Sequence, residues 1–403
     1  MLTQMNEVKN ILSKLFWTSL IGGMIGTIDF IFGQGLLYLS SFREQHILWL
    51  LPWLPLAGLV IIWLGKTFSQ EVTKGMGLIF EVGHRERKSI SLLLIPFSIV
   101  STWLTHLFGG SAGREGVAVQ LGGTIGQFVS RIRQKEGETS YWLVIGMAAG
   151  FAGLFQTPIA ATFFALEVLY VGKLIYEVLP YALLASFISA KVTHFLGLEK
   201  FVAPIHSLPK WNSSLFLKLC LAGLLFGIIG WLFSNLLLKA KQWAKVTFPN
   251  PTKRILIMGA GTALLLASLY YGRYSGLGTH LISESFNHGT IYSTDWLLKL
   301  LLTILTLAAG FQGGEVTPLF SIGASFGFLL GTWLGLPTPF LAALGYSSVF
   351  AAATNTYLGP LFIGVEVFGP GILPYLLLTL TVSFAINKNQ SIYTGQKINT
   401  FYS

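Results

Sequence analysis

The sequence predicts an all-α polytopic membrane protein, and its composition is the first observation behind that prediction. Of 403 residues, 53% are hydrophobic, 14% are aromatic and only 10% are charged, and the mean hydropathy is +0.67. Soluble domains carry roughly 25% charged residues. This composition therefore excludes a soluble enzyme and a disordered chain. The single cysteine, Cys220, excludes a secreted disulfide scaffold.

The second observation is a series of apolar segments along the whole chain. A membrane-spanning helix needs about 20 apolar residues. Several segments are shorter, and the segment that contains Pro158 is too long for one helix, so we expect broken, tilted and half-crossing helices. Lipid tolerates such breaks only where the freed backbone lines a cavity or lies inside protein. The segments are 12–40, 47–66, 89–108, 141–172, 177–196, 213–238, 254–271, 295–311, 317–333, 336–353 and 358–386.

Basic residues are scattered in small groups between these segments and give a net charge of +10. Nucleic-acid binding requires such residues to be gathered on one face, so we expect no nucleic-acid partner. The distribution is typical of loops held on the cytoplasmic side of a membrane. Two of the groups are Arg85, Arg87 and Lys88, and Lys239, Lys241, Lys245, Lys253 and Arg254.

The third observation is an internal repeat with a period of about 200 residues. Gly75-Met76-Gly77 matches Gly276-Leu277-Gly278, and Gly113–Val117 matches Gly314–Pro318, both at a separation of 201 residues. The stretch that begins at Gly146 matches the stretch that begins at Gly345, 199 residues later. Three matches in one order indicate two homologous halves, which we place at 1–196 and 215–403, the latter with a short C-terminal tail. The polar stretch 197–214 is the expected linker. Repeats with interrupted helices are typical of transporters with a site near mid-membrane.

The glycine motifs are suited to helix starts inside the membrane. A helix N-terminus has free N–H groups and about half a positive charge, so it attracts anions. We expect such starts after 75–77, after 113–116 and after 313–315. The competing interpretation of each motif is a glycine in a helix–helix contact.

Four of the 16 acidic residues lie in apolar surroundings, where a carboxylate is costly unless it is neutralised, paired or hydrated. Glu115 and Glu315 stand at expected helix starts. A carboxylate there can occupy the anion site, be displaced by an anion and take up a proton as it leaves. Glu167 and Glu366 occupy matching positions in the two halves, and we expect both to cap a helix or bond the backbone.

These motifs resemble those of a known family. Gly113-Arg114-Glu115-Gly116, followed by Val119–Gly123, resembles the GREGP signature of the CLC chloride channels and proton-coupled antiporters. Phe155–Ala160 with Glu167, and Gly313–Pro318, resemble two further CLC motifs. The resemblance implies the CLC fold, with two inverted repeats of tilted and broken helices. It also implies a homodimer with one anion pathway per subunit, in a bacterial plasma membrane.

Departures from the CLC motifs resemble the fluoride-exporting branch of the family. Met76 stands where chloride-conducting members have serine, and Val117 replaces the proline of GREGP. Glu315-Val316-Thr317 replaces Ile-Phe-Ala in the second-half motif. The second proton glutamate of the chloride antiporters falls at Val168 and is absent.

The resemblance assigns roles to individual residues. Glu115 is expected to be the gating glutamate, which exchanges protons and competes with the anion. Met76 is expected to shape selectivity, and Glu315 and Thr317 to hold the gate or fluoride. Tyr393 is expected to reach the inner end of the pathway with its hydroxyl. The other pathway positions are Gly75, Gly77, Gly113, Arg114, Gly116, Val117 and Val316. Of these, Arg114 is expected to fix local structure or raise the positive potential, without binding the anion.

The function that follows is a proton-coupled fluoride antiporter that exports cytoplasmic fluoride. Fluoride accepts strong hydrogen bonds, and its conjugate acid is a weak acid comparable to a carboxylic acid, so proton exchange with a glutamate is accessible. The alternatives are a chloride/proton exchanger of the same fold, a passive channel, and a membrane-embedded enzyme that uses Glu115 and Glu315 as acid and base. No metal-ligand pair, nucleophile motif or phosphate loop is present in the sequence, so we expect neither enzyme chemistry nor a cofactor.

Overall fold

The fold was analysed in a computed structural model that describes residues 2–134, 137–205, 207–287, 289–387 and 389–398. Helices dominate both halves of the chain. The first half contains α1 (Leu2–Leu50), α2 (Leu54–Phe68), α3 (Met76–Gly83), α4 (Leu94–Leu107), α5 (Glu115–Arg133), α6 (Thr139–Phe155), α7 (Pro158–Glu167), β1 (Tyr170–Val171) and α8 (Leu179–Phe195). The second half contains α9 (Ser213–Thr247), α10 (Pro251–Ser268), α11 (Thr279–Phe286), α12 (Asp295–Ala309), α13 (Val316–Leu334), α14 (Thr338–Thr354), α15 (Leu358–Phe368), α16 (Leu373–Ile386) and β2 (Lys397–Ile398). Short 3-10 turns lie at Leu51–Trp53, Gln70–Lys74, Tyr270–Gly272 and Pro370–Ile372.

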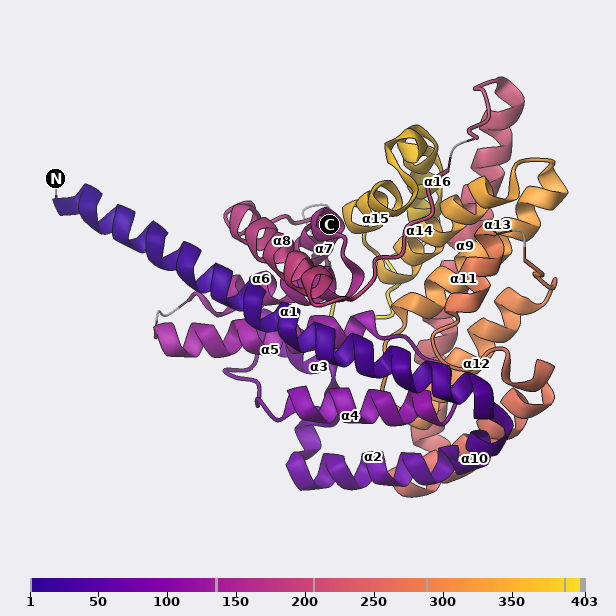
Figure 1. Ribbon diagram of the computed structural model, residues 1–403, viewed down its shortest axis with the longest axis horizontal. Helices are drawn as coiled ribbons and strands as arrows, with labels where there is room; N and C mark the ends of the chain where they lie inside the picture. The colour runs from indigo at the N-terminus through magenta and orange to yellow at the C-terminus, as the bar shows by residue number, and fades with distance from the viewer. Residues whose placement is uncertain (1, 135–136, 206, 288, 388, 399–403) are drawn as a thin grey trace.

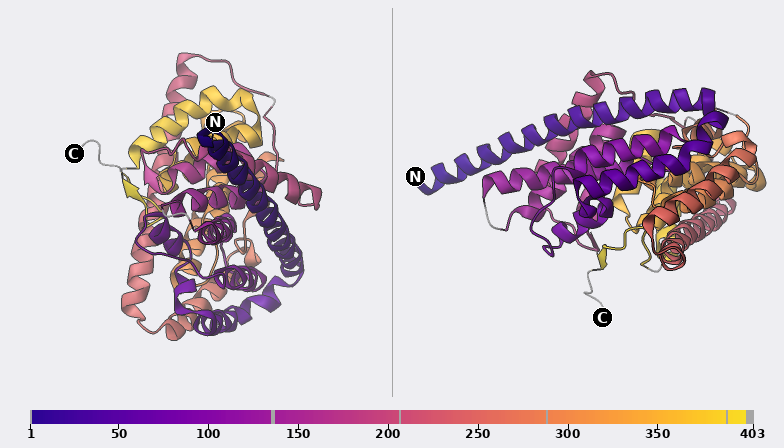
Figure 2. Two further views of the ribbon diagram at one scale, coloured as in Figure 1. Left: turned by 90° about the vertical axis from the view of Figure 1, so that its left-hand side faces the viewer. Right: turned by 90° about the horizontal axis from the view of Figure 1, so that it is seen from below.

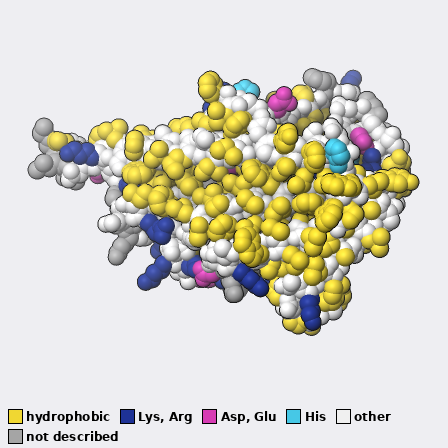
Figure 3. Space-filling view, turned by 60° about the horizontal axis from the view of Figure 1, so that its bottom comes forward, with side chains coloured by type: hydrophobic (Ala, Val, Ile, Leu, Met, Phe, Trp, Pro, Cys, Tyr) yellow, Lys and Arg dark blue, Asp and Glu magenta, His cyan; other side chains and the backbone are white. Residues whose placement is uncertain are grey.

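The helices differ widely in length, as the apolar segments predict. Among the described residues, three helical stretches are long and apolar enough to cross a bilayer: Gln4–Phe68, Ser213–Thr247 and Val316–Leu334. Others fall short, because the 14 residues of α4 span only about 21 Å at 1.5 Å each. The chain therefore crosses the membrane partly by short helices packed inside protein. Figure 3 shows a broad apolar face, with charged side chains mainly around its margins.

The two halves lie largely on opposite sides of the molecule (Figure 1). α1 runs across the first half, and its N-terminal end extends beyond the other helices (Figure 2). The helix extends beyond the segment expected at 12–40 through polar residues at both ends, and it is kinked at His46 (φ −128°). Residues 4–12 are exposed, whereas the middle and the C-terminal part of α1 pack on the rest of the protein, where Arg43 Nη1 donates to the carbonyl of His106 at 3.2 Å.

Helix pairs in the two halves pack through matching glycines. A Cβ atom added to Gly122 on α5 would overlap the carbonyl oxygen of Gly146 on α6. Gly323 on α13 and Gly345 on α14 meet in the same way. Backbones can approach this closely only where side chains are absent. The repeat register therefore places equivalent glycines in equivalent contacts.

The breaks between paired helices also repeat. α6 is followed by Gln156 (φ 56°) and α14 by Asn355 (φ 54°), both in the left-handed conformation that terminates a helix. Pro158 then begins α7. The predicted segment 141–172 is accordingly two helices. The segment 358–386 is also divided, at Gly369, whose positive φ (94°) and the following Pro370 end α15.

Candidate functional site

The two glutamate motifs meet at the centre of the fold through a backbone bridge. The N–H of Gly314 donates to the carbonyl of Gly113 at 2.8 Å, and the N–H of Gly113 donates back at 2.5 Å. The bridge immediately precedes α5 and α13, which begin at Glu115 and Val316. It therefore holds two helix N-termini side by side. α5 begins at Glu115, inside the motif 113–116 and slightly earlier than predicted, whereas α13 begins at Val316, directly after 313–315.

Glu115 occupies the N-terminal site of the opposite helix. Its side chain is fully buried, and Oε2 accepts hydrogen bonds from the Thr317 hydroxyl, from the Thr317 N–H at 3.1 Å and from the Arg114 N–H at 3.3 Å. Free N–H groups and the positive end of a helix favour an anion at this point. The carboxylate thus lies where an external anion would bind.

Arg114 faces the other carboxylate oxygen. Its Nε is 3.6 Å from Glu115 Oε1, and its side chain is 14% exposed. Neither its Nε nor its Nη1 has a hydrogen-bond partner among the described residues. The guanidinium therefore adds positive potential beside Glu115 without a directed hydrogen bond to it.

Glu315 turns away from Thr317. It is the N-cap residue of α13, its side chain is 12% exposed, and Oε1 lies 3.4 Å from Nζ of Lys241 on α9. Its other oxygen faces Gly116, where an added Cβ atom would be 3.9 Å away. The expected pair of Glu315 and Thr317 is thus divided: Thr317 binds Glu115, whereas Glu315 meets a lysine.

Tyr393 lies close enough to Glu315 and Glu115 to interact with both electrostatically. It is 6% exposed, and its ring is 5.6 Å from that of Phe80 on α3. The N–H of its neighbour Ile392 donates to Ala353 at the end of α14. The C-terminal segment is therefore fixed against the helix core at this tyrosine.

The first glycine motif forms the start of α3. Gly75 has φ 54°, a conformation that favours glycine, and a Cβ atom added to it would be 3.3 Å from the side-chain amide of Gln120 on α5. Met76 and Gly77 begin the helix. No hydrogen bond among the described residues joins either of them to Glu115. Val117 and Val316 are buried in the first turns of α5 and α13.

Glu167 and Glu366 have the shared role expected from their matching positions. Glu167 accepts from the N–H groups of Tyr357 (2.9 Å) and Gly359 (2.5 Å) at the start of α15. Glu366 accepts from those of Ile159 (3.3 Å) and Ala160 (2.8 Å) at the start of α7. Each caps a helix of the other half, so the prediction of a backbone-bonding role is confirmed.

The sequence reasoning missed four charged residues that are buried, Asp29, Arg43, Asp295 and Lys299, of which Lys299 and Asp29 lie in the interior of apolar segments. Lys299 on α12 is fully buried and donates to Ser111 Oγ at 2.9 Å, Gly276 O at 2.7 Å and Tyr274 O at 3.1 Å. Asp29 on α1 is fully buried, and neither carboxylate oxygen has a hydrogen-bond partner among the described residues. A lone charge inside an apolar segment was the signal that could have found both.

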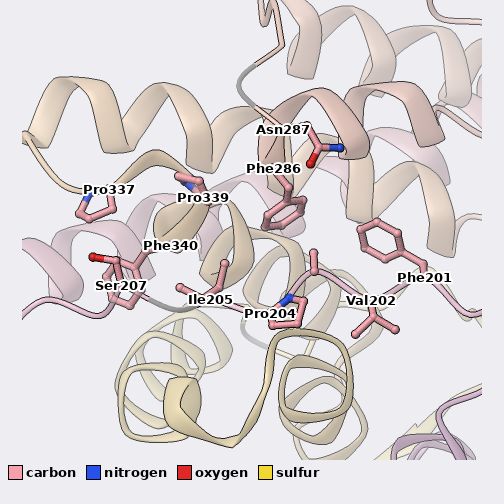
Figure 4. Close-up of a pocket in the computed structure, with 11 residues that line it drawn as sticks. Phe201, Val202, Pro204, Ile205, Ser207, Phe286, Asn287, Pro337, Pro339 and Phe340 are labelled. Atoms are coloured by element: carbon pink, nitrogen blue, oxygen red, sulfur yellow. The ribbon is translucent and has the colours of Figure 1, made fainter.

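A pocket of about 470 Å³ has none of these glutamates in its lining (Figure 4). It is formed by Phe201, Val202, Ala203, Pro204, Ile205 and Ser207 of the segment before α9, with Phe286, Asn287, Pro337, Pro339 and Phe340. None of these lining residues is ionisable. The pocket therefore has no group suited to proton transfer.

Comparisons with known proteins agree with this geometry. Residues 57–388 match the protein-family profile described as voltage gated chloride channel. A crystal structure of a CLC-type fluoride/proton antiporter superposes with a TM-score of 0.95 at 50% identity, covering 96% of this chain and 98% of that one. A slow cyanobacterial Cl⁻/H⁺ antiporter gives a TM-score of 0.80 at 19% identity, over 93% of this chain and 94% of that one. That second likeness supports the fold alone.

Among curated relatives, a chloride/fluoride channel protein of Pseudomonas syringae pv. tomato is 31% identical, over 98% of this chain and 88% of its own length. An H⁺/Cl⁻ exchange transporter of Vibrio vulnificus is 27% identical, over 92% and 85%. The similarity extends over nearly the whole of each chain.

Proposed function

Because this chain belongs to the voltage-gated chloride channel family, with a CLC fold and an integral membrane location, we propose that it is a proton-coupled fluoride antiporter that exports cytoplasmic fluoride. The observation that carries the proposal is the Glu115 carboxylate bound at the N-terminus of α13. A carboxylate that fills an anion site can be displaced only by another anion or by its own protonation.

The donors around Glu115 suit fluoride. Thr317 supplies a hydroxyl and a backbone N–H to one carboxylate oxygen, and fluoride accepts hydrogen bonds of both kinds. When fluoride takes these donors, Glu115 leaves the site, and a proton from one side of the membrane neutralises it. When Glu115 returns as a carboxylate, it releases that proton to the other side and displaces the fluoride. One site thus holds either the carboxylate or the anion, which couples the two movements.

The remaining pathway residues have proposed roles around this exchange. Met76 removes the hydroxyl that chloride-conducting relatives offer, Tyr393 borders the pathway near Glu315, and Arg114 raises the positive potential beside Glu115. The other positions, Gly75, Gly77, Gly113, Gly116, Val117 and Val316, shape the three helix starts.

The subunit organisation is part of the proposal. We propose repeats at 1–196 and 215–403 joined by the linker 197–214, and a homodimer with one pathway per subunit. We further propose that the protein is a transporter without enzymatic activity. The overall resemblance to a fluoride/proton antiporter at 50% identity supports the assignment as a transporter.

The test is ion-selective-electrode efflux from proteoliposomes loaded with fluoride or chloride, with pH recorded in the same vesicles. Fluoride efflux accompanied by proton uptake, with much slower chloride efflux, is expected. Equal or faster coupled chloride efflux would establish the alternative, a chloride/proton exchanger, which the exchange transporters among the relatives favour. Efflux of either ion without proton movement would indicate a channel.

A further inference from the structure

Lys241 is the cation that contacts Glu315 of the candidate site. α9 carries three lysines in its last turns: Lys239, Lys241 and Lys245. Of these three lysines, only Lys241 has an ion-pair partner among the described residues, with Nζ 3.4 Å from Glu315 Oε1. Lys239 and Lys245 are exposed. The position of Lys241 therefore differs from that of its neighbours, although all three were assigned to membrane topology from the sequence.

Side-chain exposure increases in steps from the anion site toward Lys241. Glu115 is fully buried and Thr317 is 3% exposed, whereas the side chain of Glu315 is 12% exposed and that of Lys241 is 37% exposed. Contacts join these residues in pairs, Glu115 to Thr317 and Glu315 to Lys241. Glu315 also follows Gly314 of the central bridge directly. Of these four residues, Lys241 is therefore the most accessible to an anion in the solvent.

The chemistry of the pair permits exchange of partners. A lysine ammonium is a compact charge with three donors, well suited to a small, strongly hydrogen-bonding anion. A partly exposed ion pair at 3.4 Å contributes little, because water screens it. An arriving anion can therefore replace the Glu315 carboxylate at Nζ with little loss, whereas Glu115 is held by fully enclosed donors.

We propose that Lys241 is the first binding position for fluoride on the side of the pathway where Glu315 meets α9, and that the anion displaces the Glu315 carboxylate from Lys241 Nζ when it binds. The inference rests on the proposed fluoride transport and adds an anion-binding residue to it. Glu315 competes with the arriving anion for Lys241, as Glu115 competes for Thr317. Two carboxylate–anion exchanges then lie in series.

The test compares fluoride KM and maximal rate in proteoliposomes for Lys241→Gln, Lys241→Arg and the matched controls Lys239→Gln and Lys245→Gln. Lys241→Gln is expected to raise KM about threefold to fivefold, because the charge-assisted hydrogen bond that is lost lies at a partly exposed, water-screened lysine, with the maximal rate changed less than twofold. Arginine should restore most of the affinity, since it keeps the charge. The two controls should match wild type.

A second background separates anion binding from mere support of Glu315. In Glu315→Gln protein, Lys241→Gln should still raise the fluoride KM at least threefold. Disappearance of that effect would show that Lys241 only neutralises Glu315, and an unchanged KM in the single variant would overturn the proposal outright. If wild type exchanges chloride instead of fluoride, the proposed function fails, and the same KM comparison made with chloride still decides the role of Lys241.

Discussion

Thr317→Val is the most informative single substitution at the candidate site. Valine keeps the shape of threonine and the backbone N–H, but it lacks the hydroxyl that donates to Glu115 Oε2. Two donors to that oxygen would remain, the N–H groups of Thr317 at 3.1 Å and Arg114 at 3.3 Å. The substitution therefore weakens the binding of the Glu115 carboxylate at this site, although two hydrogen-bond donors remain.

The magnitude follows from the loss of one hydrogen bond to a charged group, about 1.5–3 kcal/mol. Each 1.4 kcal/mol is a factor of ten, so occupancy of the α13 site by Glu115 should fall about 10- to 100-fold relative to the displaced state with the site empty, and the affinity of the site for fluoride, which uses the same hydroxyl, should fall as well. Fluoride then passes without requiring the carboxylate to return. Proton-coupled exchange should decrease, and proton-independent fluoride leak should increase.

The assay is simultaneous recording of fluoride and pH in proteoliposomes, with protein monodispersity as the folding check. Thr317→Ser retains the hydroxyl and is the matched control, and it should keep the wild-type ratio of protons to fluoride. A well-folded Thr317→Val protein with the wild-type ratio would refute the reasoning, because the hydroxyl would then have no part in holding the gate.

Three further outcomes follow from contacts outside the exchange site. Glu366→Ala should destabilise the protein by about 1–3 kcal/mol, because the two α7 N–H groups that donate to Glu366 at 3.3 and 2.8 Å lose their acceptor. The loss should appear as a lower melting temperature in detergent. A melting temperature equal to that of wild type would contradict the capping role. Gly146→Ala should prevent monodisperse expression, since its Cβ would overlap the α5 backbone, and a normally folded variant would show that the two helices can separate. The hydrogen bond from Lys397 lowers the pKa of Glu86 below its ordinary value of 4.5. The ion pair between Glu86 and Lys397 therefore stabilises the folded C-terminal segment above pH 4.5, and this stabilisation is lost as pH falls through the lowered pKa. Hydrogen exchange of the Lys397 amide, corrected for its intrinsic rate, should accelerate in that pH range in wild type. It should not do so in Glu86→Gln.

The sequence allowed the helix starts to be located because glycine motifs and their repeat are local signals. Gly75, Gly113 and Gly314 each precede a helix that begins within three residues. The capping roles of Glu167 and Glu366 were predictable for a related reason: matching positions in two halves imply a matching role. Family resemblance supplied the identity of the ion, which no spacing encodes.

The contacts between distant segments could not be predicted from the sequence. Lys241 and Glu315 lie 74 residues apart, and Lys299 and Ser111 lie 188 residues apart, so no periodicity relates them. A lysine near the end of an apolar helix has the same local pattern whether it faces lipid headgroups or a carboxylate. The break at Gly369 was also missed, because the apolar run continues on both sides of it.

The central claim is that one site holds either the Glu115 carboxylate or fluoride, with a proton moving oppositely to the anion. Its most direct test is the pH change inside proteoliposomes when an outward fluoride gradient is imposed at equal pH, with the membrane voltage clamped. Wild type should acidify the interior as fluoride leaves, Glu115→Gln should not, and the exposed control Glu199→Gln should behave as wild type. Interior alkalinisation, the signature of hydrogen fluoride leaving as a neutral molecule, or undiminished acidification in Glu115→Gln would contradict the account.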